Sequence, residues 1–319
     1  MYTKSAMGIN YSTNAATMMI DSFSVQPNYP DYEFTKRHEF EIDRFEAGFN
    51  QIIINNFSLT EYFKSNNQIS SYIGIGKMDM KVFRDKRKPF RHVDKPAFQD
   101  MIYDYPGNLN IDSITLINGN ITYTAHGEKA NEAGYINING ISAKIYKITN
   151  DSIYKTESGF LQLEANGLLM GKGRLTVLLK SKIFDYQNTF SVLGTLTEME
   201  INELNPILEK NALIYVTSGK IDAMNFSFIA NNTKAIGKMT FLYNGLDIAI
   251  KNKQTDDTTA FKERFMSVIA NAKLINSNPI PGDDARVGII DYERDPEKFL
   301  INYFFKSALT GIKSSLVKR

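Results

Sequence analysis

Apolar and polar residues alternate along most of this chain, which is the pattern of β-strands with one buried and one solvated face. The clearest example places Met224, Phe226 and Phe228 in alternation with Asn225 and Ser227. Because side chains two residues apart in a strand share a face, the pattern predicts that the three apolar residues point into one layer. The two polar residues are then expected on the opposite side.

One phrase of this pattern occurs twice, in residues 114–121 and 214–221. Each copy has an alternating run, then Asn118-Gly119 or Ser218-Gly219, and then a resumed alternation. Glycine adopts positive φ at little cost, and such dipeptides between alternating runs are typical of hairpin turns. We therefore expect Gly119 and Gly219 in turns with positive φ. Residues 239–243 predict one more strand, with a turn at Asn244-Gly245.

Further alternation predicts a hairpin or bulged pair from residues 160–163 and 175–179, on either side of Gly171. Residues 52–54 form a short apolar run that is typical of a buried strand. Together these patterns predict a mainly β fold, a long sheet-rich body built from hairpins. The chain is long enough to form one such unit over residues 1–319.

The last part of the chain changes character. Residues 1–250 are strand-rich, whereas residues 251–319 contain the main helical signals, so we expect the few helices to be concentrated towards the C-terminus. Apolar residues recur at helical spacing over residues 260–275. A shorter helical turn over residues 201–210 is expected to break at Pro206.

The best-signalled helix follows Asp295-Pro296-Glu297. Asp can cap a helix, Pro fits its first turn, and Glu suits the positive end of the helix dipole. An apolar stripe continues to about residue 312, but Lys306 and Lys313 interrupt it. We therefore expect this helix to pack on the sheet, with docking onto a membrane surface or a partner as the alternative.

Composition limits the function classes. The chain has 37 basic and 35 acidic residues, a net charge of +2, which does not by itself indicate a nucleic-acid partner. It has no cysteine, which excludes disulfides, thiolate metal sites and a cysteine nucleophile. No signal peptide or membrane-spanning run is visible. The protein is therefore either cytoplasmic or the soluble part of a longer product that lacks its membrane anchor here.

Candidate catalytic chemistry is sparse. The three histidines, His38, His92 and His126, are far apart in the sequence and not at metal-ligand spacing. The alternating acids of residues 291–295 could serve acid–base chemistry, but they lead into a predicted helix N-terminus, where acids are expected. We therefore expect no enzyme activity and no catalytic, cofactor or metal site.

The densest charge run extends from residue 81 to residue 95, with phenylalanines interleaved. Such a run can be a solvated loop, a contact for anionic lipid headgroups, or a nucleic-acid contact. The solvated loop is the simplest interpretation, because Asp85 and Asp94 offset part of the charge. The residues that would contact headgroups or another anion are Arg84, Lys86, Arg87, Lys88 and Arg91.

Short phrases spread over nearly the whole chain resemble the AsmA-like envelope proteins of Bacteroidota, relatives of TamB. The phrases that carry the resemblance are residues 20–23, 82–87, 111–123, 194–199, 218–221, 237–241, 294–296 and 311–313. The resemblance implies an elongated, curved and twisted antiparallel β-sheet with an apolar concave face. It also implies an inner-membrane anchor and a role in phospholipid transport or outer-membrane homeostasis. The anchor is missing from this chain, which departs from the family pattern.

Two functional hypotheses follow. In the first, a non-enzymatic periplasmic or inner-membrane-associated protein binds lipid acyl chains along an apolar sheet face. Its phospholipid-contacting residues would include Phe226, Phe228, Met239 and Phe241. In the second, the protein is a structural or protein-interaction module of the envelope whose own helices and loops fill that face. Neither hypothesis includes a cofactor or a nucleic acid, and other envelope proteins are candidate partners in both.

Overall fold

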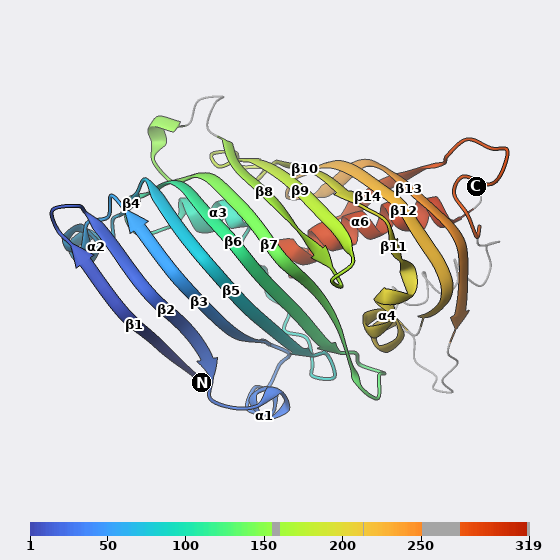
Figure 1. Cartoon of the computed structure of the whole chain (residues 1–319), viewed down its shortest axis with the longest axis horizontal. Helices are drawn as coiled ribbons and strands as arrows, with labels where there is room; N and C mark the ends of the chain where they lie inside the picture. Colours follow the sequence, from blue (N-terminus) through green and yellow to red (C-terminus); the bar gives the residue numbers. More distant parts are fainter. Residues whose placement is uncertain (155–159, 213, 251–274, 318–319) are drawn as a thin grey trace.

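A computed structural model describes residues 1–154, 160–212, 214–250 and 275–317. The chain is mainly β, with 55% of residues in strands and 18% in helices, and its strands form a single large sheet that is not closed (Figure 1). The predicted fold class is therefore confirmed, including the excess of strand over helix. The alternation at residues 224–228 is confirmed as well, because Met224, Phe226 and Phe228 are buried while Asn225 and Ser227 are exposed.

The sheet contains these strands in the described residues: β1 (Tyr2–Ser12), β2 (Thr17–Pro27), β3 (Asp43–Asn55), β4 (Gln68–Ser70), β5 (Tyr72–Asp85), β6 (Leu109–His126), β7 (Ala133–Thr149), β8 (Phe160–Leu169), β9 (Gly173–Lys182), β10 (Phe190–Leu196), β11 (Met199–Glu200), β12 (Ile214–Ala230), β13 (Lys234–Ile250) and β14 (Val287–Glu293). Twelve of them follow one another in the order β1-β2-β3-β5-β6-β7-β8-β9-β10-β12-β13-β14. Short β4 and β11 pair with β6 and β12. Strands close in sequence are therefore neighbours in space.

The sheet is mixed, which corrects the expectation of a purely antiparallel one. β5 and β6 are parallel, as are β4 and β6, whereas the other pairs are antiparallel. Parallel neighbours need a crossover connection rather than a tight turn. Residues 86–108 provide it: they leave one end of β5, include a short helix, and return the chain to the other end of the sheet.

Gly119 and Gly219 lie inside long strands, so the predicted hairpin turns are wrong. Both sit at irregularities in the strand register, Gly119 in the β6–β7 pair and Gly219 in the β12–β13 pair. Gly219 has the expected positive φ of 136°, whereas Gly119 does not have positive φ. A β-bulge and a hairpin turn both favour glycine, so the local sequence did not distinguish them. The repeated phrase marks two bulged strands.

Asn244-Gly245 shows the same correction, because both residues lie within β13, where Gly245 has a φ of 62°. The hairpin predicted on either side of Gly171 is confirmed: β8 and β9 pair along their whole length, and Gly171 lies in the turn between them. Residues 52–54 lie in β3 but are only half-buried. Long strands bent by bulges thus replace some of the expected hairpins.

The described helices are α1 (Asp31–Lys36), α2 (Leu59–Ser65), α3 (Phe98–Tyr103), α4 (Asn205–Ala212) and α6 (Leu300–Leu316), with single 3₁₀ turns at Ser152–Tyr154 and Ile201–Leu204. The first three are short and were not predicted. Pro206 lies in the first turn of α4 and does not break it, because that turn needs no backbone donor there. The helix predicted over residues 260–275 lies outside the described residues, apart from Ile275.

The C-terminal helix α6 is confirmed but begins later than predicted, at Leu300. Asp295 instead accepts a hydrogen bond from the backbone of Glu297 (3.0 Å), within a turn that precedes the helix. The helix packs against β13 and β14. In the part of the chain that the structure describes, no helix has the length and apolar character needed to span a membrane.

Replacing Gly219 with Ala should lower the free energy of unfolding by about 1 kcal/mol or more, because an L side chain is strained at its positive φ. Gly48→Ala in β3 is the matched control, since its φ is ordinary and its added Cβ would meet nothing within 4 Å. Urea unfolding of both variants measures the difference. Equal stability of the two variants would contradict the bulge assignment.

Candidate functional site

The two faces of the sheet differ sharply, and the inner face is the one that carries α6. Phe304 of α6 makes ring contacts with Phe226 and Phe228 of β12, with centroid distances of 6.0 and 5.7 Å. Residues directly opposite one another on paired strands share a face. The strand register therefore shows which residues of each strand lie on the inner face.

An unbroken apolar row crosses all twelve successive strands on the inner face. It starts at Ile9 in β1 and ends at Gly288 in β14, and each neighbouring pair in it is directly opposed. The row is Ile9, Ile20, Ile52, Ile75, Leu116, Ala143, Ala165, Val177, Gly194, Phe226, Met239 and Gly288. Strands lie about 4.8 Å apart, so the row is roughly 50 Å long.

A second row runs beside the first and has no charged side chain either. Its members are Tyr11, Met18, Ile54, Ile73, Ile114, Ile145, Leu163, Leu179, Val192, Phe228, Gly237 and Ile290. Positive φ at Gly8 and Gln51 interrupts the alternation part-way along β1 and β3. Beyond this kink the outer face carries a more polar row, Ser5, Ser24, Gly48, Asp79 and Asn120. The inner face is therefore a continuous apolar surface that no single strand reveals.

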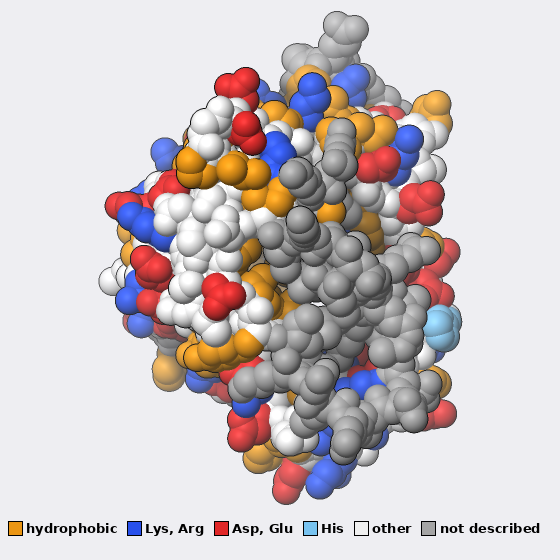
Figure 2. Space-filling view, turned by 90° about the vertical axis from the view of Figure 1, so that its right-hand side faces the viewer, with side chains coloured by type: hydrophobic (Ala, Val, Ile, Leu, Met, Phe, Trp, Pro, Cys, Tyr) orange, Lys and Arg blue, Asp and Glu red, His pale blue; other side chains and the backbone are white. Residues whose placement is uncertain are grey.

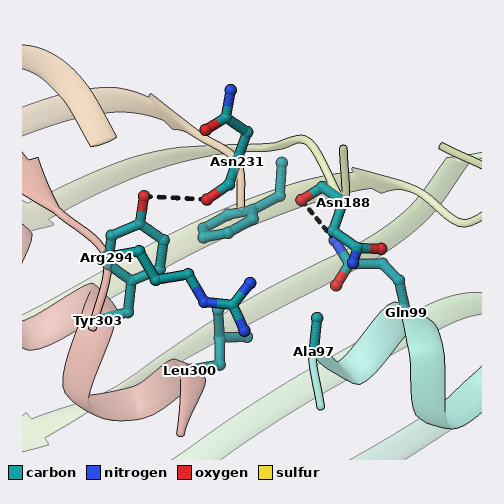
Figure 3. A pocket seen from close by; sticks show the side chains of 8 residues that line it. Ala97, Gln99, Asn188, Asn231, Arg294, Leu300 and Tyr303 are labelled. Atoms are coloured by element: carbon teal, nitrogen blue, oxygen red, sulfur yellow. Dashed lines mark hydrogen bonds between the residues drawn. The ribbon is translucent and has the colours of Figure 1, made fainter. Parts of the chain in front are cut away.

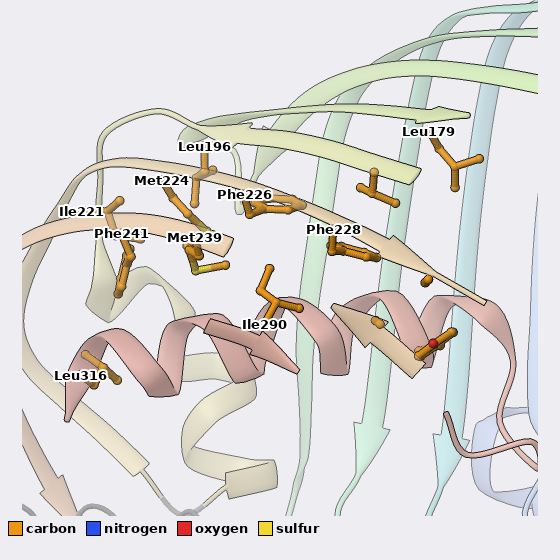
Figure 4. Close-up of a cluster of buried hydrophobic side chains, with 14 of the residues drawn as sticks. Leu179, Leu196, Ile221, Met224, Phe226, Phe228, Met239, Phe241, Ile290 and Leu316 are labelled. Carbon is orange, nitrogen blue, oxygen red and sulfur yellow. The ribbon is translucent and has the colours of Figure 1, made fainter. Parts of the chain in front are cut away.

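At the C-terminal strands α6 covers this surface. Phe226, Phe228, Met239 and Phe241 point from β12 and β13 towards the helix (Figure 4) and are only 1–6% exposed. The helix lies close because Gly288 and Gly311 face each other: a Cβ on Gly288 would come 2.3 Å from the carbonyl oxygen of Gly311. The four residues expected to contact lipid thus share one face, but they belong to the core beneath α6.

At the N-terminal strands the same face is more open. Ile9 of β1 is 57% exposed and Phe45 of β3 is 44% exposed, although both lie on the inner side. Between them and the buried C-terminal part, Ile20, Ile52 and Ile75 are half-buried. The exposure of the apolar row therefore falls from β1 towards β14.

The five basic residues singled out in the sequence do not converge on one site. Arg84 pairs with Asp43 at 3.0 Å, and Arg87 makes two hydrogen bonds to Asp85, of 2.8 and 2.7 Å. The Nζ of Lys88 donates a hydrogen bond to the His38 carbonyl oxygen at 2.8 Å. The side chains of Lys86 and Arg91 are exposed. At least three of the five therefore have contacts within the protein.

The rest of the basic segment docks on the turn that leads into α6. The backbone of Lys95 donates to the Pro296 carbonyl oxygen at 2.8 Å, and Lys298 lies against the ring of Phe90. His92 is 3.0 Å from a carboxylate oxygen of Glu297. Seen from the C-terminal strands in Figure 2, basic and acidic side chains are interspersed and form no field of one sign. The segment joins the N-terminal strands to the helix.

A small charged cluster borders the inner face where β3 begins and β5 and β6 end. Burial raises the pKa of Asp43 above its usual range, although the nearby charge of Arg84 opposes this shift. Burial also raises the pKa of Tyr123 to about 12. On α6, burial lowers the pKa of Lys306 to about 8, and the charge of Lys86 lowers it further. The three shifts share one cause, the burial of an ionisable group.

Beside the N-terminus of α6, residues from four parts of the chain enclose a cavity of about 10 Å³ (Figure 3). Gln99 donates to the Asn188 carbonyl oxygen at 2.9 Å, and the Tyr303 hydroxyl donates to the Asn231 carbonyl oxygen at 3.1 Å. This volume matches about one water molecule, so the cavity does not suit an organic ligand. The sequence contained no signal for it, because its residues meet only through the fold.

The histidines and the acids of residues 291–295 do not assemble a reactive site. His126 is buried, and its Nδ1 forms a hydrogen bond of 2.8 Å with the Tyr32 hydroxyl. Asp291 and Glu293 are exposed on β14, whereas Asp295 bonds within its own turn. Among the described residues no group of His, Asp or Glu could hold a metal ion.

Comparison with known proteins found no matching family model and no matching curated protein. The resemblance to AsmA-like proteins therefore stays a hypothesis based on short phrases of sequence.

Phe228→Ala should lower the free energy of unfolding by about 3–5 kcal/mol, because it leaves a cavity between β12 and α6. The neighbouring Ile229, which is exposed on the outer face, supplies the control variant Ile229→Ala, for which we expect a change of about 0.5 kcal/mol or less. Urea unfolding measures both. A small effect of Phe228→Ala would contradict the packing of α6 on this face.

Tyr303 provides a test by pH. Burial raises its pKa to about 12, so the unfolded chain loses the phenolic proton at lower pH than the folded chain does, and stability falls as pH rises from about 10 to about 12. Tyr303→Phe should cost about 1 kcal/mol at pH 7 through the lost hydrogen bond. Because Phe cannot ionise, this deficit should shrink above pH 10. A deficit that is constant from pH 7 to 11.5 would contradict the assignment.

Proposed function

We propose that the protein is a non-enzymatic protein of the cell envelope that binds lipid acyl chains along its inner face. The observation that carries the proposal is the apolar row that crosses twelve strands without a charged side chain. A soluble protein normally buries so large an apolar surface or uses it for binding. Acyl chains are suitable ligands because they need only apolar surface and no hydrogen-bond partners.

Contact with lipid is proposed for the N-terminal strands rather than for β12 and β13. Ile9 and Phe45 are the exposed members of the inner face, whereas Phe226, Phe228, Met239 and Phe241 lie beneath α6. The proposal therefore moves the lipid-contacting region away from the four residues that the sequence suggested. The resemblance to AsmA-like proteins supports a periplasmic or inner-membrane-associated location and a role in phospholipid transport or outer-membrane homeostasis.

A second function is favoured by the packing of α6. Because the helix covers the inner face at the C-terminal strands, the protein can also be a structural or interaction module with a self-filled core. The two functions differ in one property, since only the first requires lipid on the inner face. Mass spectrometry of lipids extracted from the purified protein separates them.

Ile9→Glu should reduce the affinity for a fluorescent phospholipid by about tenfold or more, because an unpaired carboxylate against hydrocarbon is costly. Met7→Glu is the matched control: Met7 lies in the same strand and is 66% exposed. Gly8, between the two residues, has a φ of 66°, which interrupts the alternation and leaves Met7 on the outer face. Both variants should keep the wild-type circular dichroism spectrum. Equal lipid binding by both variants would refute the site at β1, and wild-type protein without lipid would favour the structural module.

A further inference from the structure

The outer face carries an aliphatic stripe near the C-terminal strands, although polar residues prevail on much of that face. We define the outer stripe as Leu178 of β9, Leu193 of β10, Ile229 of β12, Ile236 of β13 and Ile289 of β14. Its central members Leu193, Ile229 and Ile236 are 54%, 62% and 51% exposed. They lie on the side opposite α6, so the inner core does not explain them.

The register makes the outer stripe continuous. Leu178 is directly opposite Leu193, and Ile229 is directly opposite Ile236. Leu193 faces Ser227, two residues from Ile229, which makes Leu193 and Ile229 diagonal neighbours about 7–8 Å apart. Ile289 faces Lys238, two residues from Ile236, and is connected in the same way. Five aliphatic side chains thus run obliquely across five strands.

A shallow hollow of about 400 Å³ lies beside the stripe. Leu178 and Leu193 form part of its wall, and Lys238 and Thr240 lie on another part. Hydroxyl and amide groups from four further outward-facing residues complete the polar side of the lining: Thr176, Thr195, Asn225 and Ser227. The hollow therefore offers hydrogen-bond groups and one positive charge next to exposed aliphatic side chains.

The charges around the stripe are mixed but basic on balance. Four lysines lie on the outer side of β9 and β13: Lys180, Lys182, Lys234 and Lys238. Three acids on the neighbouring strands β8 and β14 lie among them: Glu164, Asp291 and Glu293. Glu164 is opposite Leu178, Asp291 is opposite Ile236, and Glu293 is opposite Lys234. Four lysines against three acids leave a small positive excess beside the aliphatic residues.

We propose that the outer stripe and its lysines dock the protein onto the surface of an anionic phospholipid bilayer. Protein interfaces favour Tyr, Trp and Arg and are poor in Lys, whereas the stripe contains only Leu and Ile bordered by Lys. Short aliphatic side chains enter the headgroup boundary, and lysines on long stems contact lipid phosphates. The hollow then accommodates headgroup oxygens. This inference concerns the outer face and does not depend on the proposed function of the inner face.

The first test is co-sedimentation with vesicles of phosphatidylcholine alone or mixed with phosphatidylglycerol. Wild-type protein should bind the mixed vesicles, and more weakly at high salt. The double variant Ile229→Ser with Ile236→Ser should reduce the partition coefficient by about tenfold, because it removes the most exposed aliphatic surface. Met7→Ser, also on the outer face but distant in strand order, is the matched control and should bind like wild type.

A second measurement locates the contact directly. The chain has no tryptophan, so Ile229→Trp provides a single reporter whose emission should shift to shorter wavelength with mixed vesicles. Met7→Trp should not shift. If Ile9→Glu reduces vesicle binding as strongly as the double variant does, the contact belongs to the inner face and the outer stripe is overturned as the docking site.

The proposal is overturned if wild-type protein binds no vesicles, or binds neutral and anionic vesicles equally. It is also overturned if the double variant and Met7→Ser bind the mixed vesicles equally well. The same holds if light scattering shows that the wild-type protein is a dimer and the double variant is a monomer. In the last case the outer stripe is an interface between two copies of the chain. Circular dichroism of each variant verifies the fold, and a double variant that loses its fold is replaced by Ile229→Ser alone.

Discussion

The structure depends on shielding one side of an open sheet from water. Two apolar rows cross twelve strands on the inner face, and water in contact with so much apolar surface is unfavourable. At the C-terminal strands α6 provides the shield, and Gly288 and Gly311 let its backbone approach the sheet closely. Ser307 and Ser315 can be buried in the same helix because their hydroxyls donate to carbonyl oxygens one turn earlier, those of Tyr303 and Gly311.

The same requirement explains why much of the basic segment is bonded within the protein. To cover the C-terminal strands, α6 must be held against them, and its leading turn is bonded to residues 92–95. Arg84 and Arg87 are paired with Asp43 and Asp85, so their charges are largely balanced within the fold. Burial of this region also shifts the pKa values of Tyr123 and Lys306. Basic residues that are dense in the sequence thus pair with acidic residues of the same protein once the chain is folded.

The two faces of the sheet suggest two different contacts with lipid. The two apolar rows of the inner face decrease in exposure from β1 to β14, which is why the proposed acyl-chain contact lies at the N-terminal strands. The outer face is more polar, except where the outer stripe adjoins lysines and a hollow. The vesicle and lipid-binding experiments address these properties separately.

The sequence by itself determined which residues share a face within one strand, because alternation has the same period as the pleat, as Met224, Phe226 and Phe228 show. It also determined α6, whose apolar stripe is local. Tertiary structure decided the rest. Glycine suits bulges and turns alike, so the partner strands placed Gly219 inside β12. The crossover after β5 made β6 parallel. Only the packing of α6 buried Phe226 and Met239, because burial depends on residues distant in sequence that cover them.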